Sequence, residues 1–192
     1  MEPQRLSFQN LCANIALNEF RNVSTLQVAV ADQRTQAAIP VIDPRQQFNF
    51  AAVNAHGHWK GETVDVIRID DLNLKSCRLI KIDVEGGEVG VLNGGKETIN
   101  QFRPVLFVEN NTVEGSAPII ETILSLGDRA FWHLADYYNP ENYFRNADNV
   151  FAGFRPEANL LCFHKTHEGN ITGCPEVTGI DNDWLKAARR LQ

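Results

Sequence analysis

Short apolar runs that end at an acidic residue recur along this chain, and they constrain its fold more than any other feature. The clearest runs span residues 24–32, 78–84 and 104–109. Segments with the apolar spacing of amphipathic helices lie between or beside them, at 5–20, 86–102 and 117–126. Strands that alternate with helices in this way predict a mostly parallel sheet with helices on both faces, which is the α/β class.

The remaining segments complete this pattern. We expect further strands at 64–72, 130–135 and 160–164, and a short amphipathic helix at 183–191. Residues 33–62 are polar and predict a loop with weak hairpin strands. Gly94-Gly95 falls in the middle of the helix expected over 86–102 and weakens that helix. Since 192 residues suffice for one sizeable core, we expect one domain over residues 1–192.

Composition and charge exclude several classes of protein. The net charge of −6 leaves no basic surface for a nucleic-acid backbone. No apolar run approaches the roughly 20 residues of a membrane helix. The four cysteines include no CxxC pair, and no apolar leader follows Met1. We therefore expect a cytoplasmic protein with reduced cysteines and neither a nucleic-acid nor a membrane partner.

The acidic residues at the strand ends are the candidate site, because ligands of open α/β sheets bind outside the carboxyl ends of the strands. These positions hold Asp32, Asp83 with Glu85, and Glu109 with Asn110, and Glu2 joins them if a strand precedes it. Carboxylates there can hold a cofactor, bind a metal or take a proton from a hydroxyl. Alternatively, Asp83 and Glu85 cap the helix that follows Gly86-Gly87. The spacing leaves both interpretations open.

Two other patterns do not support a site. Residues 90–96 have the glycine and lysine spacing of a phosphate-binding loop, but Glu97 stands where that loop needs serine or threonine. Cys162, His164, His167 and Cys174 are metal-ligating types, but their spacing fits no common structural zinc signature. We expect this set to be metal-free, with Cys162 packed as a small buried hydrophobe.

Several motifs together resemble one enzyme family. The matching segments are Glu2-Pro3-Gln4, residues 29–32, Ile69-Asp70-Asp71-Leu72, residues 79–88, Leu92-Asn93-Gly94-Gly95 and residues 103–109. In these segments the chain resembles the FkbM-type S-adenosylmethionine-dependent methyltransferases. The resemblance is most specific at residues 69–72 followed by residues 79–88, and it weakens after about Glu114.

The resemblance implies a fold, a reaction and roles for individual residues. The fold would be a Rossmann-like sheet with one antiparallel strand near its edge, and the reaction would be O-methylation of a sugar or polyketide-type small molecule. Glu2 would accept hydrogen bonds from the cofactor ribose, Asp32 would lie near the adenine, and Asp83 would lie near the sulfonium. Asp83, Glu85 and Glu109 would be the catalytic carboxylates, and a divalent metal on these oxygens is left open.

In that family a first strand and a glycine-rich turn precede the position of Glu2, whereas this sequence begins at Met1. We therefore expect a partial methyltransferase domain that lacks the first strand and binds S-adenosylmethionine weakly or not at all. Its open sheet edges should favour self-association or poor solubility. The alternative function is a catalytically inactive remnant that serves as a binding or assembly module.

Overall fold

The computed structural model describes residues 1–41, 43, 45, 61–167 and 171–188. Its contacts divide the chain into two compact units. The first unit comprises Met1–Cys77 and Asp83–Phe102, and the second comprises Arg78–Ile82 and Arg103–Gln192. The expectation of a single domain over 1–192 stays a prediction.

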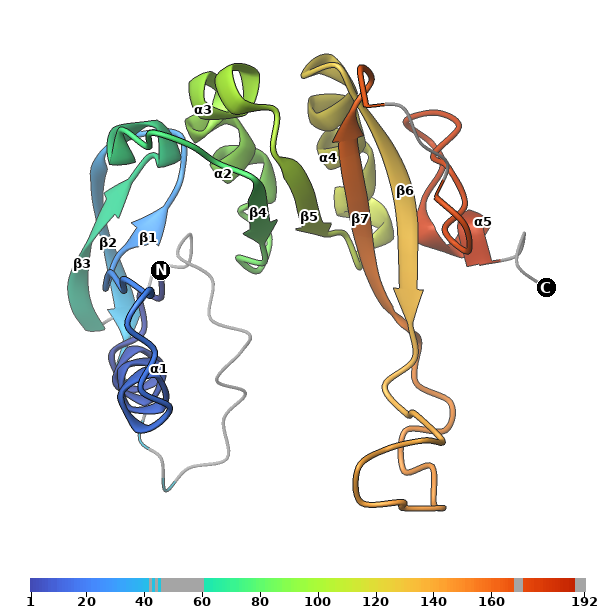
Figure 1. Cartoon of the computed structure of the whole chain (residues 1–192), viewed down its shortest axis with the longest axis horizontal. Helices are drawn as coiled ribbons and strands as arrows, with labels where there is room; N and C mark the ends of the chain where they lie inside the picture. Colours follow the sequence, from blue (N-terminus) through green and yellow to red (C-terminus); the bar gives the residue numbers. More distant parts are fainter. Residues whose placement is uncertain (42, 44, 46–60, 168–170, 189–192) are drawn as a thin grey trace. The chain divides into compact units, whose positions relative to one another are not determined.

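The first unit contains a three-stranded mixed sheet of order β1-β3-β2 (Figure 1). Strand β1 (Ala29–Val30) runs parallel to β3 (Gly61–Ile67), and β2 (Thr35–Pro40) runs antiparallel to β3. Ala29, Ile39, Val64 and Val66 form its buried core. The strand predicted over 24–32 is thus much shorter, and the weak hairpin strands expected in 33–62 include β2. Residues 42, 44 and 46–60 of that loop lie outside the described residues.

The described residues of the first unit form four helical segments. They are α1 (Arg5–Leu17), the 3-10 helix η2 (Ile69–Leu72), α2 (Glu88–Gly94) and α3 (Lys96–Phe102). The expected strand over 64–72 therefore ends at Ile67 and gives way to η2. The expected helix over 86–102 is two helices that meet at Gly95, in agreement with the weakness that Gly94-Gly95 predicts.

Helix α1 confirms a helix near the amino terminus but not the buried face expected for it. None of its residues is buried, and Leu17 is 81% exposed. The side chain of Gln4 caps the helix by accepting a hydrogen bond from the Ser7 N–H at 2.8 Å. Arg5 forms an ion pair of 2.6 Å with Glu62 of β3. The helix therefore has a side-chain cap and a surface ion pair, and it lacks the buried apolar face that was expected.

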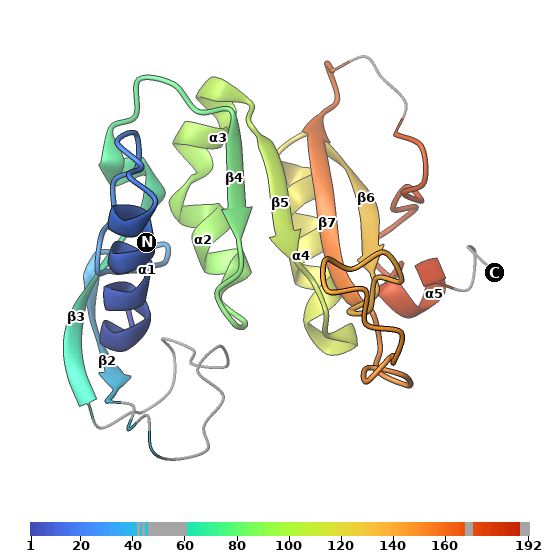
Figure 2. The same cartoon turned by 60° about the horizontal axis from the view of Figure 1, so that its bottom comes forward.

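The second unit contains a four-stranded sheet of order β4-β5-β7-β6 (Figure 2). Its strands are β4 (Leu79–Ile82), β5 (Val105–Glu109), β6 (Asp128–Ala135) and β7 (Glu157–His164). Strands β4 and β5 are parallel, and β7 is antiparallel to both β5 and β6. Strands β4, β5 and β6 therefore share one direction, and β7 is the antiparallel strand near the edge that the resemblance implies.

Apolar rows across this sheet form the core of the second unit. Leu106, Cys162 and Ala130 lie in one register row, and Val108, Leu160 and Trp132 lie in the next. All six are buried. Helix α4 (Val113–Ser125) lies against one face of the sheet in both views (Figures 1 and 2) and buries Ser116, Ile119, Ile120 and Ile123, which share one helical face. Helix α5 (Trp184–Ala188) contacts β6.

The described residues confirm the α/β class but not the expected single, mostly parallel sheet. Their strands form two mixed sheets, with one parallel pair in each. The apolar runs predicted the positions of several strands, but an apolar pattern does not indicate which strands pair with one another. The expectation that the fold lacks a first strand, and the open edges that would follow from it, stay predictions.

Candidate functional site

The carboxyl ends of β4 and β5 bring together the three carboxylates predicted to be catalytic. Ile82 pairs with Val108, so Asp83 directly follows β4 where Glu109 ends the neighbouring β5. Asp83, Glu85 and Glu109 each offer an oxygen within 4.8 Å of those of the other two. Since each residue belongs to or closely follows one of two paired strands, the strand register is the cause of this proximity.

The turn after β4 has a backbone that few residues tolerate. Glu85 and Gly86 both have positive φ angles, of 53° and 94°, and glycine adopts this region without steric cost. Glu88 braces the turn, because its Oε1 accepts hydrogen bonds from the Gly86 N–H at 3.0 Å and the Val84 N–H at 3.4 Å. Glu88 is buried, and α2 begins there, directly after Gly87. The sequence left a helix-capping role for Asp83 and Glu85 open as one of two interpretations, and it gave no sign of this role of Glu88.

Three carboxylates this close raise the local negative potential. Such a site favours a cationic ligand, and it accepts hydrogen bonds or a proton from a hydroxyl. Oxygen ligands of this kind also suit hard divalent cations, but exposed acidic groups are common without one. Asp83 is exposed and Glu85 is half-buried, so a ligand can reach both from solvent.

The residues predicted to bind the cofactor occupy two further positions in the first unit. Half-buried Glu2 accepts the Gln4 N–H on its Oε1 at 2.8 Å, and its own N–H donates to the Leu26 carbonyl at 3.1 Å. Asp32 is exposed and stands two residues beyond β1. The Ala31 N–H, just before it, donates to the Ile67 carbonyl at 3.0 Å and so extends the pairing with β3. Their roles stay predictions.

The segment Ile69-Asp70-Asp71-Leu72, which carries much of the resemblance, is structural. Asp70 accepts hydrogen bonds from the Glu97 and Thr98 N–H groups at the start of α3, at 3.1 and 2.8 Å. Asp71 forms ion pairs with Arg34 and Arg68, at 2.7 and 2.8 Å. Hydrogen bonds from these two guanidinium groups hold the pKa of Asp71 well below its usual range.

Two polar residues, one directly after β5 and one in α4, are buried. Asn110 is 2% exposed, and neither its Nδ2 nor its Oδ1 has a hydrogen-bond partner among the described residues. Ser116, which is 1% exposed in α4, likewise has no partner for its Oγ there. A buried amide without partners destabilises a fold. The sequence pattern places Asn110 with Glu109 at the end of a strand, whereas no sequence signal pointed to Ser116.

The metal-ligating types near the carboxyl end do not form a recognisable site within the described ranges. Cys162 is fully buried in the sheet, where burial raises the pKa of its thiol well above the usual value, so the expected packing role is confirmed. The Nδ1 of His164 lies 2.8 Å from the Thr166 hydroxyl, and Cys174 is half-buried. That this set binds no metal stays a prediction.

Asp128 is an unusual buried acid at the start of β6. Its Oδ2 has no hydrogen-bond partner within the described residues, and burial raises its pKa to about 6. Because the folded state then holds a proton that the unfolded chain releases near pH 3.9, this group lowers stability as the pH rises from about 4 to about 6. Asp128→Asn should therefore raise the melting temperature at pH 7.5, with a smaller effect at pH 4.

Thermal unfolding of Asp128→Asn and the parent chain between pH 4 and pH 7.5 checks this expectation. Asp148→Asn is the matched control, because Asp148 is exposed and should change stability equally little at each pH. A difference between Asp128→Asn and the parent that does not grow with pH would contradict the argument.

Comparison with known proteins supplies a family and a fold. The family model described as the methyltransferase FkbM domain matches residues 1–131. The structure of methyltransferase FkbM from Methylobacillus flagellatus KT is similar, with a TM-score of 0.51 and 18% sequence identity. That match covers 84% of this chain and 35% of the other, so the chain spans about a third of the length of its structural relative. At this identity the likeness concerns the fold alone.

A comparison with curated proteins found no match. No helix in the described part of the chain is long and apolar enough to cross a membrane. The family match covers more than half of the chain, including Glu2, Asp32 and the carboxylates that end β4 and β5. The chain therefore belongs to the methyltransferase FkbM domain family.

Proposed function

We propose that this chain takes part in S-adenosylmethionine-dependent O-methylation of a hydroxyl on a sugar or polyketide-type small molecule. The observation that carries the proposal is the group of Asp83, Glu85 and Glu109 at the carboxyl ends of β4 and β5. Family membership supplies the methyltransferase class, and the carboxylates supply groups able to orient and deprotonate a hydroxyl.

The residues present fit the cofactor by their chemistry. Ribose hydroxyls are donors, and the half-buried carboxylate of Glu2 is an acceptor whose orientation is fixed by the Gln4 N–H. A sulfonium is cationic, and Asp83 provides the opposite charge. Asp32 would lie on the adenine side. When bound, the cofactor supplies an electrophilic methyl group.

The acidic side chains would act on the acceptor. Asp83 or Glu85, assisted by Glu109, would accept the hydrogen bond of the acceptor hydroxyl and hold its oxygen in line with the methyl carbon. As the oxygen–carbon bond forms and the methyl–sulfur bond breaks, the hydroxyl proton passes to the carboxylate and later to solvent. Most of the rate enhancement would come from this positioning, since the displacement is a single step.

Titration calorimetry with S-adenosylmethionine, extended to millimolar concentration, tests the cofactor assignment. We expect saturable binding that S-adenosylhomocysteine competes with, and that Glu2→Ala weakens by about tenfold through loss of a charge-assisted hydrogen bond. Glu19→Ala is the matched control, because Glu19 is an exposed acid beyond the end of α1.

Transfer of a labelled methyl group from the cofactor to a panel of hydroxyl compounds tests the reaction. Cofactor binding without transfer to any hydroxyl would overturn the O-methyltransferase assignment. Absence of cofactor binding would favour the alternative of a non-catalytic binding or assembly module.

A further inference from the structure

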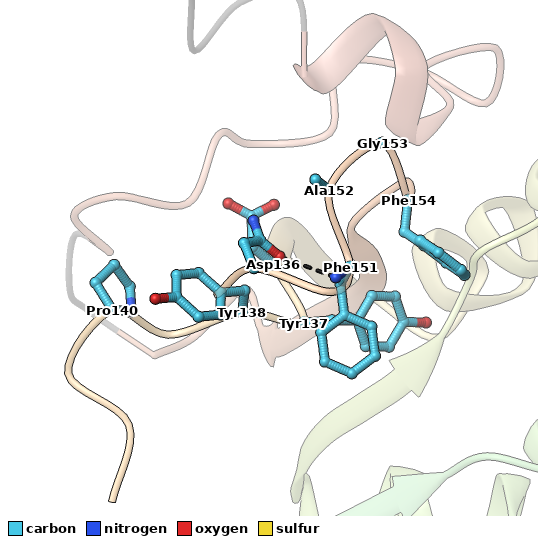
Figure 3. A pocket seen from close by; sticks show the side chains of 9 residues that line it. Asp136, Tyr137, Tyr138, Pro140, Phe151, Ala152, Gly153 and Phe154 are labelled. Atoms are coloured by element: carbon cyan, nitrogen blue, oxygen red, sulfur yellow. Dashed lines mark hydrogen bonds between the residues drawn. The ribbon is translucent and has the colours of Figure 1, made fainter. Parts of the chain in front are cut away.

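The connection between β6 and β7 holds a pocket that none of the roles above uses. Its volume is about 320 Å³. It is lined by Asp136, Tyr137, Tyr138, Pro140, Asn149, Phe151, Ala152, Gly153 and Phe154 (Figure 3). Ligand sites commonly span about 300–1,000 Å³, so this pocket suits a single ring or a group of similar size.

Aromatic rings form much of the wall. The ring centroids of Tyr137 and Phe151 lie 5.7 Å apart, and those of Phe151 and Phe154 lie 6.1 Å apart. Figure 3 shows Asp136 between this group and a second one formed by Tyr138 and Pro140. Apolar ring faces therefore border a carboxylate. The rings of Tyr137, Phe151 and Phe154 remain exposed, which costs free energy unless a ligand covers them.

Hydrogen bonds within the loop and to the first residue of β7 hold these rings in place. The Tyr137 hydroxyl donates to Glu157 at 2.7 Å, and the Tyr138 hydroxyl lies 2.9 Å from the Asn146 carbonyl. The Phe151 N–H donates to Asn149 Oδ1 at 3.0 Å, which Figure 3 marks. Because both phenol hydroxyls already donate to other groups of the protein, the tyrosines offer a ligand their ring faces instead of a hydroxyl donor.

The strand register places this loop at the functional edge of its sheet. Strand β6 runs in the direction of β5, so the loop after Ala135 leaves the sheet at the edge where Glu109 ends β5. Glu109 pairs with Asn159, and Asn159 pairs with His133, two residues before the end of β6. Open α/β sheets bind ligands at this edge.

We infer that this pocket binds the ring of the methyl acceptor, and that the ring is a neutral sugar. This inference rests on the proposed function for the assignment to the acceptor. A sugar ring presents an apolar C–H face to an aromatic ring and hydroxyl donors to a carboxylate, which matches the two kinds of surface here. Among the described lining residues, Asp136 is the only one with a charged side chain, and its carboxylate repels anionic sugars. An extended polyketide chain would leave the compact ring-sized pocket poorly filled.

Saturation-transfer difference NMR on the full chain, without cofactor, tests the pocket. The probes are methyl hexopyranosides of gluco, galacto, manno and fuco configuration, the anionic methyl glucuronide and the cation choline. We expect at least one neutral glycoside to bind and both ions to fail. Phe151→Ala and Phe151→Leu should each weaken its binding by about tenfold, because leucine fills space but has no aromatic face.

Phe144→Ala is the matched control. Phe144 stacks edge-on against Tyr143 in the same loop but does not line the pocket, so its loss should change affinity less than twofold. Circular dichroism confirms that the variants fold, and Phe154→Leu replaces any that does not. Binding of choline alone, no binding of a neutral glycoside, or binding that the pocket variants leave unchanged would overturn the inference.

Methyl transfer separates this inference from the proposed function. Glycoside binding that depends on Phe151 but leads to no methyl transfer would support the pocket as a sugar site and overturn the proposed methylation reaction. Methyl transfer whose KM for the acceptor is unchanged in Phe151→Leu would keep the reaction and overturn the pocket as the acceptor site.

Discussion

Replacement of Asp83 by asparagine should lower the turnover number of methyl transfer by about 10²–10⁴-fold, the range that general-base catalysis commonly contributes. Asparagine keeps the shape of the side chain but cannot take the proton of the acceptor hydroxyl. It also removes one negative charge from the group shared with Glu85 and Glu109. Because Asp83 is exposed at the end of β4, we expect little change in melting temperature. Initial rates at saturating cofactor, measured beside thermal unfolding, check both expectations.

Glu121→Gln is the control for this substitution. Glu121 is an exposed acid on α4, so its change removes the same charge from the chain without touching the carboxylate group. It should leave turnover within twofold of the parent. Parent-like turnover in Asp83→Asn would remove Asp83 from the mechanism. An equal loss in both variants would show that net charge, and not position, sets the rate.

The sequence predicted the strand ends well because their signal is local. An apolar run followed by an acid marks both β4 and β5, and the parallel pairing of these two strands suffices to bring Asp83 and Glu109 together. Gly86-Gly87 after the run correctly indicates a sharp turn, in which Gly86 has a positive φ angle. The helix at the amino terminus, α4 and the closing strands were predictable for the same reason.

Features that depend on distant partners could not be read from the sequence. The pairing of β5 with β7 joins residues about fifty positions apart, and no residue pattern encodes it. The division into two sheets and the burial of the Asn110 amide also depend on residues that are distant in the sequence. Asp70 and Asp71 look like candidate acids, yet the first caps α3 and the second pairs with arginines, which only the fold reveals.

The pocket between β6 and β7 was predictable in part. Residues 137–154 are rich in aromatic side chains and lie between two predicted strands. Which rings cluster depends on hydrogen bonds such as Tyr137 to Glu157, and these join residues twenty positions apart. Tyr143 and Phe144 are aromatic residues of the same segment, but they are not among the residues that line the pocket.

A large effect on stability is expected at Gly94, the last residue of α2. A Cβ atom on Gly94 would lie 2.0 Å from the Ala31 carbonyl oxygen and 3.1 Å from the Asp32 Cα, both of which are backbone atoms. Backbone cannot move aside as a flexible side chain can, so α2 must shift away from the end of β1. Gly94→Ala should destabilise the chain by about 1–3 kcal/mol or more, as overpacking of a tight contact does.

Gly90→Ala in the same helix is the matched control for this prediction. Its Cβ would lie 3.9 Å from the nearest atoms of Ala31 and Asp32, which is ordinary contact. The change should stabilise α2 by up to about 1 kcal/mol, because alanine is the better helix former. Urea unfolding of both variants measures the free energy of unfolding, which should fall in Gly94→Ala and rise in Gly90→Ala. Since the clash in Gly94→Ala also displaces the backbone beside Asp32, it should weaken cofactor binding in the same variant, whereas Gly90→Ala should not. Equal stability of the two variants would mean that α2 does not lie against β1 as described.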